Sequence, residues 1–370
     1  MNKVLAAVIG AVLLVALVLF LLLRPKATPP PPAGLAADAA PSIETPPPST
    51  LTPPPRPLVD SGTGAATPTL DGGLPKAKGE VLIKAAWGGA PEQFGRKRDP
   101  ESNPEAPMAL VAGRPGEVAI VDQVNRRIER YKDGKLAATL TIGGDTVQDL
   151  ALGEGGRTVV LDRLADRNVQ VYGPDGKLLN EVTLEGKGVP EGGGVTGVFT
   201  DDKGIYVERD HTTLVRVADP SGTTDKDRPE LPGRPTRDGR LYIQTAIANR
   251  ETGDLVVRAW DQKTGQPAWE RIVPVGLPIL HITMLDSDRQ GMIYVAADAG
   301  RESPQPPYLV MDEAIIVTRL APNGTPRGQL ILPAFSAAEE TFRPMTVDDQ
   351  GNVLMMVPGP GGMTVLRFGW

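Results

Sequence analysis

The sequence predicts an all-β fold, a six-bladed β-propeller, on three observations. Short apolar runs bounded by Gly, Pro and Asp-Gly turns follow one another from residue 79 to residue 370, at a spacing of about 8–12 residues that is typical of antiparallel sheet. Thr158–Asp162 repeats Val118–Asp122 forty residues later, which is the period of a propeller blade. A spare strand, Gly79–Trp87, precedes the first unit, and the last unit lacks one strand. An N-terminal strand that completes the last blade would remove both open sheet edges.

Grouping the expected strands by four gives six units. They cover residues 105–142, 146–184, 194–232, 238–275, 278–334 and 342–370. The innermost strands are expected at residues 108–112, 147–152, 195–200, 240–245, 279–285 and 344–347. The fifth unit carries an insertion from Arg301 to Asp312. Residues 185–250 have the least clear strand pattern, so seven blades is the alternative to six.

The N-terminal residues 1–24 are expected to form a transmembrane anchor. Val4–Leu23 is a run of twenty residues without a charge, and a helix of that length spans about 30 Å, the thickness of a hydrocarbon core. A cleaved signal peptide is the alternative, but its apolar region is usually about 7–15 residues and ends at small residues, whereas Arg24-Pro25-Lys26 follows here. Positive charges flank both ends of this apolar run, so the distribution of charge barely decides its orientation in the membrane. The resemblance to bacterial signal-anchor proteins therefore sets the expected location: a single-pass inner-membrane protein with a cytoplasmic N-terminus and a periplasmic propeller.

Residues 25–78 are expected to be a disordered, proline-rich linker that precedes the propeller domain of residues 79–370. Fifteen prolines lie between Pro25 and Pro75, and large apolar residues are scarce. Such a segment cannot bury enough surface to offset the entropy of ordering. Fifty residues of extended polyproline II reach about 150 Å. A spacer accounts for this composition; a ligand for a proline-binding groove and a stalk across the cell wall are the alternatives.

Composition excludes several classes of function. The chain has no cysteine, which excludes disulfides, thiol catalysis and thiolate metal sites and is compatible with an oxidising compartment. The net charge is −6 with acids and bases interspersed. Because no basic patch with interleaved aromatic residues occurs, nucleic acid is not an expected partner.

The first unit resembles an NHL repeat. Trp87–Gly89, Gln93–Gly95 and Val118–Asp122, followed by Asn125 and Arg127, match that family's WG start, GxF turn and strand ending in D-x-x-N-x-R. The match covers the first unit well and the second partly. It implies a six-bladed propeller used mostly for binding. The polar residues at the end of this strand are expected to hold the blade together rather than to perform chemistry.

The fourth unit resembles a quinoprotein-type propeller repeat. Ala259–Trp269 fits the pattern AxDxxTGxxxW. The resemblance implies that Asp261, Thr264 and Gly265 form a turn and that Trp269 docks between neighbouring blades. The motif occurs once, and many proteins with it bind no quinone, so no cofactor is expected; a quinone-binding or other cofactor-binding domain is a further alternative.

Candidate chemical residues are few. His211 and His281 are the only histidines, and they fall in different units without the spacing of a metal site or a catalytic triad. Acid pairs occur at turns between strands, where Asp commonly bonds backbone amides; they are Asp201-Asp202, Asp286/Asp288 and Asp348-Asp349. Among the expected innermost strands, Asp149 and His281 are the polar exceptions and the candidates for a channel metal. No catalytic, cofactor-binding or metal-binding residue is assigned beyond these two candidates.

These observations predict a non-enzymatic module. We expect a membrane-anchored propeller, held off the bilayer by its linker, that acts as a scaffold and binds another protein of the bacterial envelope. The alternative is a propeller-type hydrolase or lyase with a metal in the channel.

Overall fold

The computed structural model describes residues 76–370, except residues 102, 145 and 335–336. The expected anchor of residues 1–24 and nearly all of the linker of residues 25–78 therefore lie outside the described residues. Within the described part, no helix has the length and apolar character needed to cross a membrane.

The described chain folds as six four-stranded antiparallel sheets, which confirms the all-β, six-bladed propeller. The first blade contains β2 (Ala109–Ala112), β3 (Glu117–Asp122), β4 (Arg127–Lys132) and β5 (Lys135–Thr141). The second contains β6 (Asp149–Leu152), β7 (Thr158–Asp162), β8 (Asn168–Tyr172) and β9 (Leu178–Thr183). The third contains β10 (Val195–Thr200), β11 (Ile205–Arg209), β12 (Thr213–Ala218) and β13 (Glu230–Leu231).

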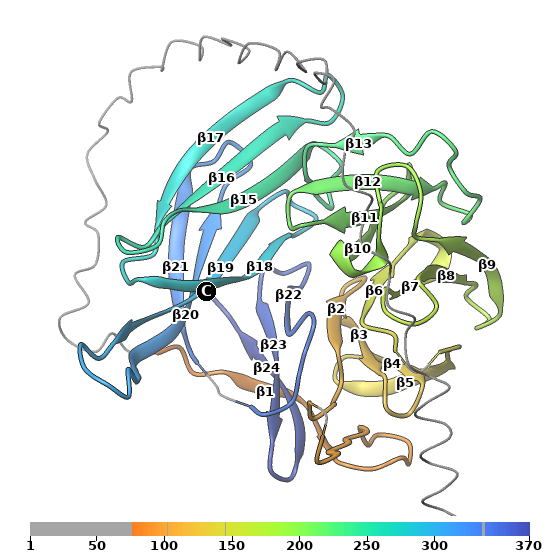
Figure 1. Ribbon diagram of the computed structural model, residues 1–370, viewed down its shortest axis with the longest axis horizontal. Coiled ribbons are helices and arrows are strands. Elements are labelled where there is room, and N and C mark those ends of the chain that lie inside the picture. The colour runs from red at the N-terminus through yellow and green to blue at the C-terminus, as the bar shows by residue number, and fades with distance from the viewer. Residues whose placement is uncertain (1–75, 102, 145, 335–336) are drawn as a thin grey trace, which may run out of the picture. The chain divides into compact units, whose positions relative to one another are not determined.

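The fourth blade contains β14 (Arg234–Pro235), β15 (Leu241–Asn249), β16 (Asp254–Asp261) and β17 (Pro267–Pro274). The fifth contains β18 (Ile279–Ser287), β19 (Ile293–Glu302), β20 (Val310–Leu320) and β21 (Pro326–Pro333). The sixth contains β22 (Met345–Val347), β23 (Val353–Gly359), β24 (Gly362–Phe368) and β1 (Glu80–Ala86). Two short 3-10 turns, Glu154–Gly156 and Gly192–Gly194, complete the described elements. Figure 1 shows the sheets following one another in chain order.

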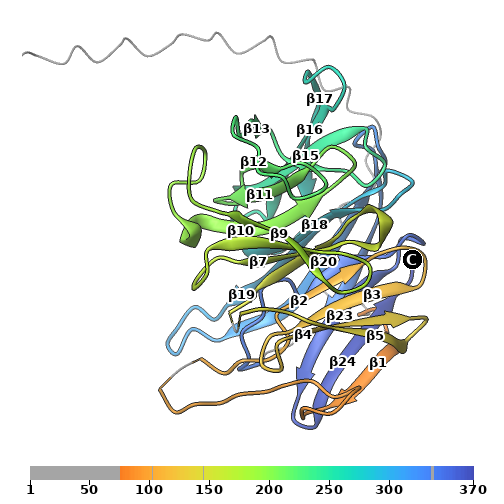
Figure 2. The same cartoon turned by 90° about the vertical axis from the view of Figure 1, so that its right-hand side faces the viewer.

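The ring is closed by the N-terminal strand, as the sequence predicts. β1 is the outermost strand of the last sheet, whose order is β1-β24-β23-β22, and Ala85 pairs with Met363 in antiparallel register. Figure 2 shows β1 and β24 side by side. Strands from the two ends of the propeller therefore share one sheet, and β1 completes the sixth blade to four strands.

The fourth blade differs from expectation. Its innermost strand is β14, which has only two residues, whereas the segment expected to be innermost, residues 240–245, belongs mostly to the second strand, β15. β14 pairs with β15 only at Tyr242 and Ile243. Two residues, an arginine and a proline, are too few to show the alternation by which a strand is recognised in a sequence, and proline is uncommon within sheets.

Hydrophobic clusters fill five of the six junctions between blades. Each of the five buried clusters of the described residues draws its members from two neighbouring blades: first and second, second and third, fourth and fifth, fifth and sixth, and sixth and first. None of the five spans the third and fourth blades. Four buried apolar side chains of these two blades belong to none of the five clusters: Tyr206, Leu214, Tyr242 and Val256. Charged contacts add to this junction.

The tight pairing of β1 with β24 predicts a specific sensitivity. A Cβ atom at Gly362 would lie 2.0 Å from the carbonyl oxygen of Ala85, whereas a Cβ at Gly361 would meet nothing within 4 Å. We expect Gly362→Ala to lower the free energy of unfolding by about 2 kcal/mol or more, because the two strands must move apart. Urea unfolding of the full chain measures this change. Gly361→Ala is the matched control; equal stability of the two variants would contradict closure by β1.

Candidate functional site

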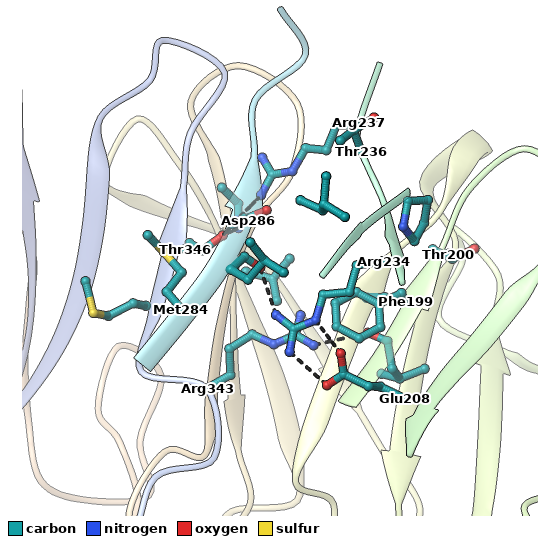
Figure 3. A pocket seen from close by; sticks show the side chains of 18 of the residues that line it. Phe199, Thr200, Glu208, Arg234, Thr236, Arg237, Met284, Asp286, Arg343 and Thr346 are labelled. Carbon is teal, nitrogen blue, oxygen red and sulfur yellow. Dashed lines mark hydrogen bonds and ion pairs between the residues drawn. The ribbon is translucent and has the colours of Figure 1, made fainter. Parts of the chain in front are cut away.

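A cavity of about 1140 Å³ lies among the inner strands of the propeller. All six blades contribute to its wall. Representative lining residues are Val111, Ala151, Val198, Arg234, Met284 and Met345. Ligand pockets typically measure about 300–1,000 Å³, so this cavity is large enough for more than a small metabolite. Figure 3 shows its polar side chains.

Arg234 bridges the third, fourth and fifth blades. Its guanidinium forms a bidentate ion pair with Glu208, at 2.7 Å from Nε to Oε1 and 2.8 Å from Nη2 to Oε2. Nη1 donates to the carbonyl oxygen of Leu285 in the fifth blade at 2.8 Å. Glu208 faces the fourth blade because Val207, its neighbour on β11, packs into the cluster shared with the second blade, and side chains alternate along a strand.

Arg343 reaches across the channel from the sixth blade. Its Nη2 lies 2.6 Å from Oδ2 of Asp149 in the second blade and 3.2 Å from the carbonyl oxygen of Val198 in the third. The guanidinium carbons of Arg343 and Arg234 each lie 4.8 Å from the centre of the Phe199 ring. Figure 3 shows both guanidinium groups beside this ring. Cation–π contacts thus join the two ion pairs into one network.

Arg237 links the fourth, fifth and sixth blades. Its Nη2 donates to Oδ2 of Asp286 at 2.8 Å, and its Nη1 donates to the carbonyl oxygen of Val347 at 2.7 Å. The backbone N–H of Val347 also donates to Asp286 at 3.0 Å. Arg237 and Asp286 therefore connect the fourth, fifth and sixth blades at the cavity wall.

The environment holds Glu208 in its ionised form. Burial alone would raise the pKa of this carboxyl group, but the charge and hydrogen bonds of Arg234 outweigh burial, and the hydroxyl of Thr196 adds a further hydrogen bond. The pKa of Glu208 therefore lies below its ordinary value. Asp298 behaves in the opposite way: burial, reinforced by the neighbouring Glu313, raises its pKa.

The two channel candidates predicted from the sequence, Asp149 and His281, have different surroundings. Asp149 is fully buried, and besides Arg343 it accepts from the backbone N–H groups of Leu150 at 2.9 Å and Val198 at 2.8 Å. His281 lines the cavity, with Nδ1 at 4.0 Å from Asp298. No hydrogen bond or ion pair joins the candidates within the described residues. In that same part of the chain, no group of three His, Asp or Glu side chains is placed to hold a metal ion. The metal-dependent hydrolase or lyase stays a prediction.

Most of the acid pairs act at turns, as expected. Oδ1 of Asp201 accepts from the backbone N–H of Lys203 at 2.8 Å, and Oδ1 of Asp348 accepts from that of Gln350 at 2.9 Å. Asp286 differs, because it joins the network of Arg237 described above. The spacing of the acidic residues in the sequence does not distinguish a turn residue from a member of the arginine network.

The polar residues of the first blade form the expected internal contact. Asp122 accepts from the backbone N–H of Gly95 at 2.9 Å, from the side-chain amide of Asn125 at 2.8 Å and from Nε of Arg127 at 2.9 Å. These bonds tie the end of β3 to the segment between β1 and β2 and to the loop that leads into β4. In the fourth blade, the indole N–H of Trp269 donates to the carbonyl oxygen of Pro322 in the fifth blade at 2.8 Å, so it does dock against its neighbour.

The arginines of the network were missed by reasoning from the sequence. Arg234, Arg237 and Arg343 lie outside the expected innermost strands, so the polar residues within those strands do not include them. One signal was present: Arg234-Pro235 and Arg343-Pro344 both stand just before or at the beginning of an innermost strand. An arginine at this position points into the channel.

A second surface projects from the fifth blade. The expected insertion forms the end of the β19–β20 hairpin, which extends beyond the neighbouring strands in Figure 1. Its tip exposes four consecutive apolar residues, with exposed fractions of 58%, 62%, 40% and 55% from Tyr308 to Met311. We call residues 308–311 the hairpin tip.

Comparisons with known proteins assign the chain to no family. No protein-family model and no curated protein matches the chain. Among solved structures, the chain is similar to hydrazine synthase of Kuenenia stuttgartiensis, at a TM-score of 0.48 and 12% identity over 74% of this chain and 80% of that one. It is also similar to a protein of unknown function from Bacteroides caccae, at a TM-score of 0.38 and 13% identity over 64% of this chain and 85% of that one. Likenesses at this level carry no argument about function, and the blade count rests on the strand pairing.

The cross-channel ion pair predicts a large cost for loss of one partner. Asp149→Asn leaves the partly buried guanidinium of Arg343 without its buried carboxylate partner, and we expect the free energy of unfolding to fall by about 3–5 kcal/mol. Asp175→Asn, at an exposed turn of the second blade, is the control, expected to leave the free energy of unfolding nearly unchanged. The double variant Asp149→Asn/Arg343→Leu should lose less than the sum of its single variants. A strictly additive double variant would contradict the coupling.

The lowered pKa of Glu208 predicts a loss of stability in acid. A carboxyl group whose pKa is lower in the folded state stabilises the fold above its ordinary pKa of 4.5, and this contribution disappears as the pH falls through the folded-state pKa. We expect Glu208→Gln to reduce Tm at pH 7 and to flatten the further fall of Tm toward pH 3. Exposed Glu181 supplies the control, since Glu181→Gln should follow the wild-type profile. If the Tm of Glu208→Gln fell toward pH 3 as steeply as that of the wild type, this ion pair would not control stability in acid.

Proposed function

We propose that the protein is a membrane-anchored, extracytoplasmic propeller that binds another protein of the bacterial envelope as a scaffold module. The observation that carries this proposal is the exposed hairpin tip of residues 308–311. Contiguous apolar residues that project into solvent mark interaction surfaces more often than isolated ones do. Tyr308 and Met311 are also residue types enriched in protein interfaces.

The cavity supports binding in a second way. Its arginines are held in position by carboxylates and carbonyl groups from several blades, as the contacts of Arg234 and Arg237 show. A wall held in this way loses little freedom when a partner binds, and such preorganisation favours affinity.

The proposed location has its support in the N-terminal sequence. Val4–Leu23 is long and apolar enough to span a bilayer, and the proline-rich residues that follow suit a spacer. An inner-membrane anchor with a cytoplasmic N-terminus would place the propeller in the periplasm. A relation to NHL and quinoprotein-type repeats is part of the same proposal; the contacts of Asp122 and Trp269 support it.

A site-specific photo-cross-linker tests the docking surface in intact cells. Placed at Leu309, it should yield an adduct with one envelope protein, and the full chain should stay in the membrane fraction after a carbonate wash. Placed at Leu179, which is 48% exposed on the outer strand β9, it should yield no such adduct. Exchange of Tyr308 and Met311 for serine should reduce the Leu309 adduct at least about tenfold, since buried apolar anchors dominate interface energies. Equal adducts from both positions, or loss of the protein from membranes on washing, would contradict the proposal.

A further inference from the structure

The short β14 leaves an open strand edge in the cavity. β15 pairs with β14 only at Tyr242 and Ile243. The next residues, Gln244–Ile247, line the cavity and pair only with β16 on their other side among the described residues. Residues 244–247 of β15 therefore form an inner strand edge of the blade that no other described strand covers.

Backbone groups of two residues face this edge. In antiparallel sheet, the N–H and C=O groups of alternate residues point to opposite sides of a strand. Arg240 directs its carbonyl oxygen to the β16 side, where it accepts from Gln262 at 2.9 Å, whereas Leu241 directs its own toward β14, where it accepts from Thr236 at 2.8 Å. By this alternation, Thr245 and Ile247 present their N–H and C=O groups to the cavity. Two donors and two acceptors are the set that an added strand would use.

The walls beside this edge differ in character. On the side of the third blade, Gln244 donates to the carbonyl oxygen of Thr212 at 3.0 Å, and the adjoining lining residues are Thr196 and His211. On the side of the fifth blade, Ile247 and Ile282 pack against the apolar cluster that the fourth and fifth blades share, and His281 and Thr283 also line the cavity. A strand added along β15 would therefore meet a polar wall with one face and a partly apolar wall with the other, which suits an alternating sequence.

The charge at this edge favours an acidic ligand. Arg234 and Arg343 each have a carboxylate partner. Arg250, which also lines the cavity, donates to the carbonyl oxygens of Ile279 and Leu280, both at 2.6 Å, and has no carboxylate within ion-pair distance among the described residues. One guanidinium charge is therefore uncompensated at the edge, where it would attract a carboxylate.

We propose that the edge of β15 binds an extended, acidic segment of a partner polypeptide by strand addition at Thr245 and Ile247. This site goes beyond the proposed function, because it uses a different surface from the hairpin tip and is independent of it. The main-chain bonds supply affinity, the two walls select alternating polar and apolar side chains, and Arg250 selects a carboxylate.

Selection of random peptides displayed on phage against the full-length protein provides the probe. We expect enriched peptides to combine an Asp or Glu with alternating β-branched residues. Synthetic copies are then measured by calorimetry. Thr245→Pro removes the N–H that faces the cavity, not one that faces β16, and should weaken binding roughly tenfold, the value of one or two hydrogen bonds. Thr245→Ala keeps that N–H and should bind within about twofold of wild type, and Arg250→Gln should weaken acidic peptides selectively.

Hydrogen exchange locates the bound segment directly. The amides of Thr245 and Ile247 should exchange quickly in the free protein and become protected with peptide, while the amide of Ala246, which faces β16, should be protected in both states. Peptide binding that Thr245→Pro leaves unchanged, protection elsewhere, or failure to enrich any peptide would each overturn the strand-addition site. None of these results affects cross-linking at Leu309, so failure of this site and failure of the proposed function are distinguishable.

Discussion

The ion pair of Arg234 with Glu208 is the charged contact that ties the third blade to the fourth at the cavity. The other five junctions have shared apolar clusters, so their blades attract each other over a broad surface. Between the third and fourth blades, the bidentate pair and the stacking of Arg234 on Phe199 add to the burial of Tyr206 and Tyr242. Because Arg234 also reaches Leu285, this single side chain sets the relative position of three blades.

An ion pair is a weaker source of stability than an apolar cluster, and this affects the shape of the channel. Desolvation of two charges offsets much of their attraction, so a buried pair often contributes little net stability although loss of one partner is costly. What the pair provides is a defined relative orientation of the two blades. The groups must meet at a defined distance and angle, and the polar atoms around them resist close apolar packing. The cavity therefore stays open where the blades would otherwise close together.

The blades and ring closure could be predicted because their signals are local: period-two strands, Asp-Gly turns and a spare strand at Gly79–Trp87. The contact of Asp122 with Arg127 was foreseeable because only five residues separate them. The pair of Arg343 with Asp149 joins residues 194 positions apart, and no local pattern encodes such a partner. Asp149 stood out as a carboxylate in an apolar strand, and the structure accounts for it through that partner. The anchor and the location stay predictions.

Gly233 to Thr236 explain why the ion pair and the open strand edge occur together. A Cβ at Gly233 would lie 2.3 Å from the carbonyl oxygen of Ile243, so only glycine permits this approach to β15. At the hairpin end of β14, Thr236 bonds Leu241 through both its backbone N–H and its hydroxyl group, which turns the chain into β15. At the other end, the register of Arg234 with Ile243 places the residues before Arg234 opposite Thr245 and Ile247. Pro232 has no N–H to join the ladder there, and Glu230–Leu231 pair with β12 in the third blade instead. The segment that positions Arg234 against Glu208 therefore also leaves the backbone groups of Thr245 and Ile247 open to the cavity.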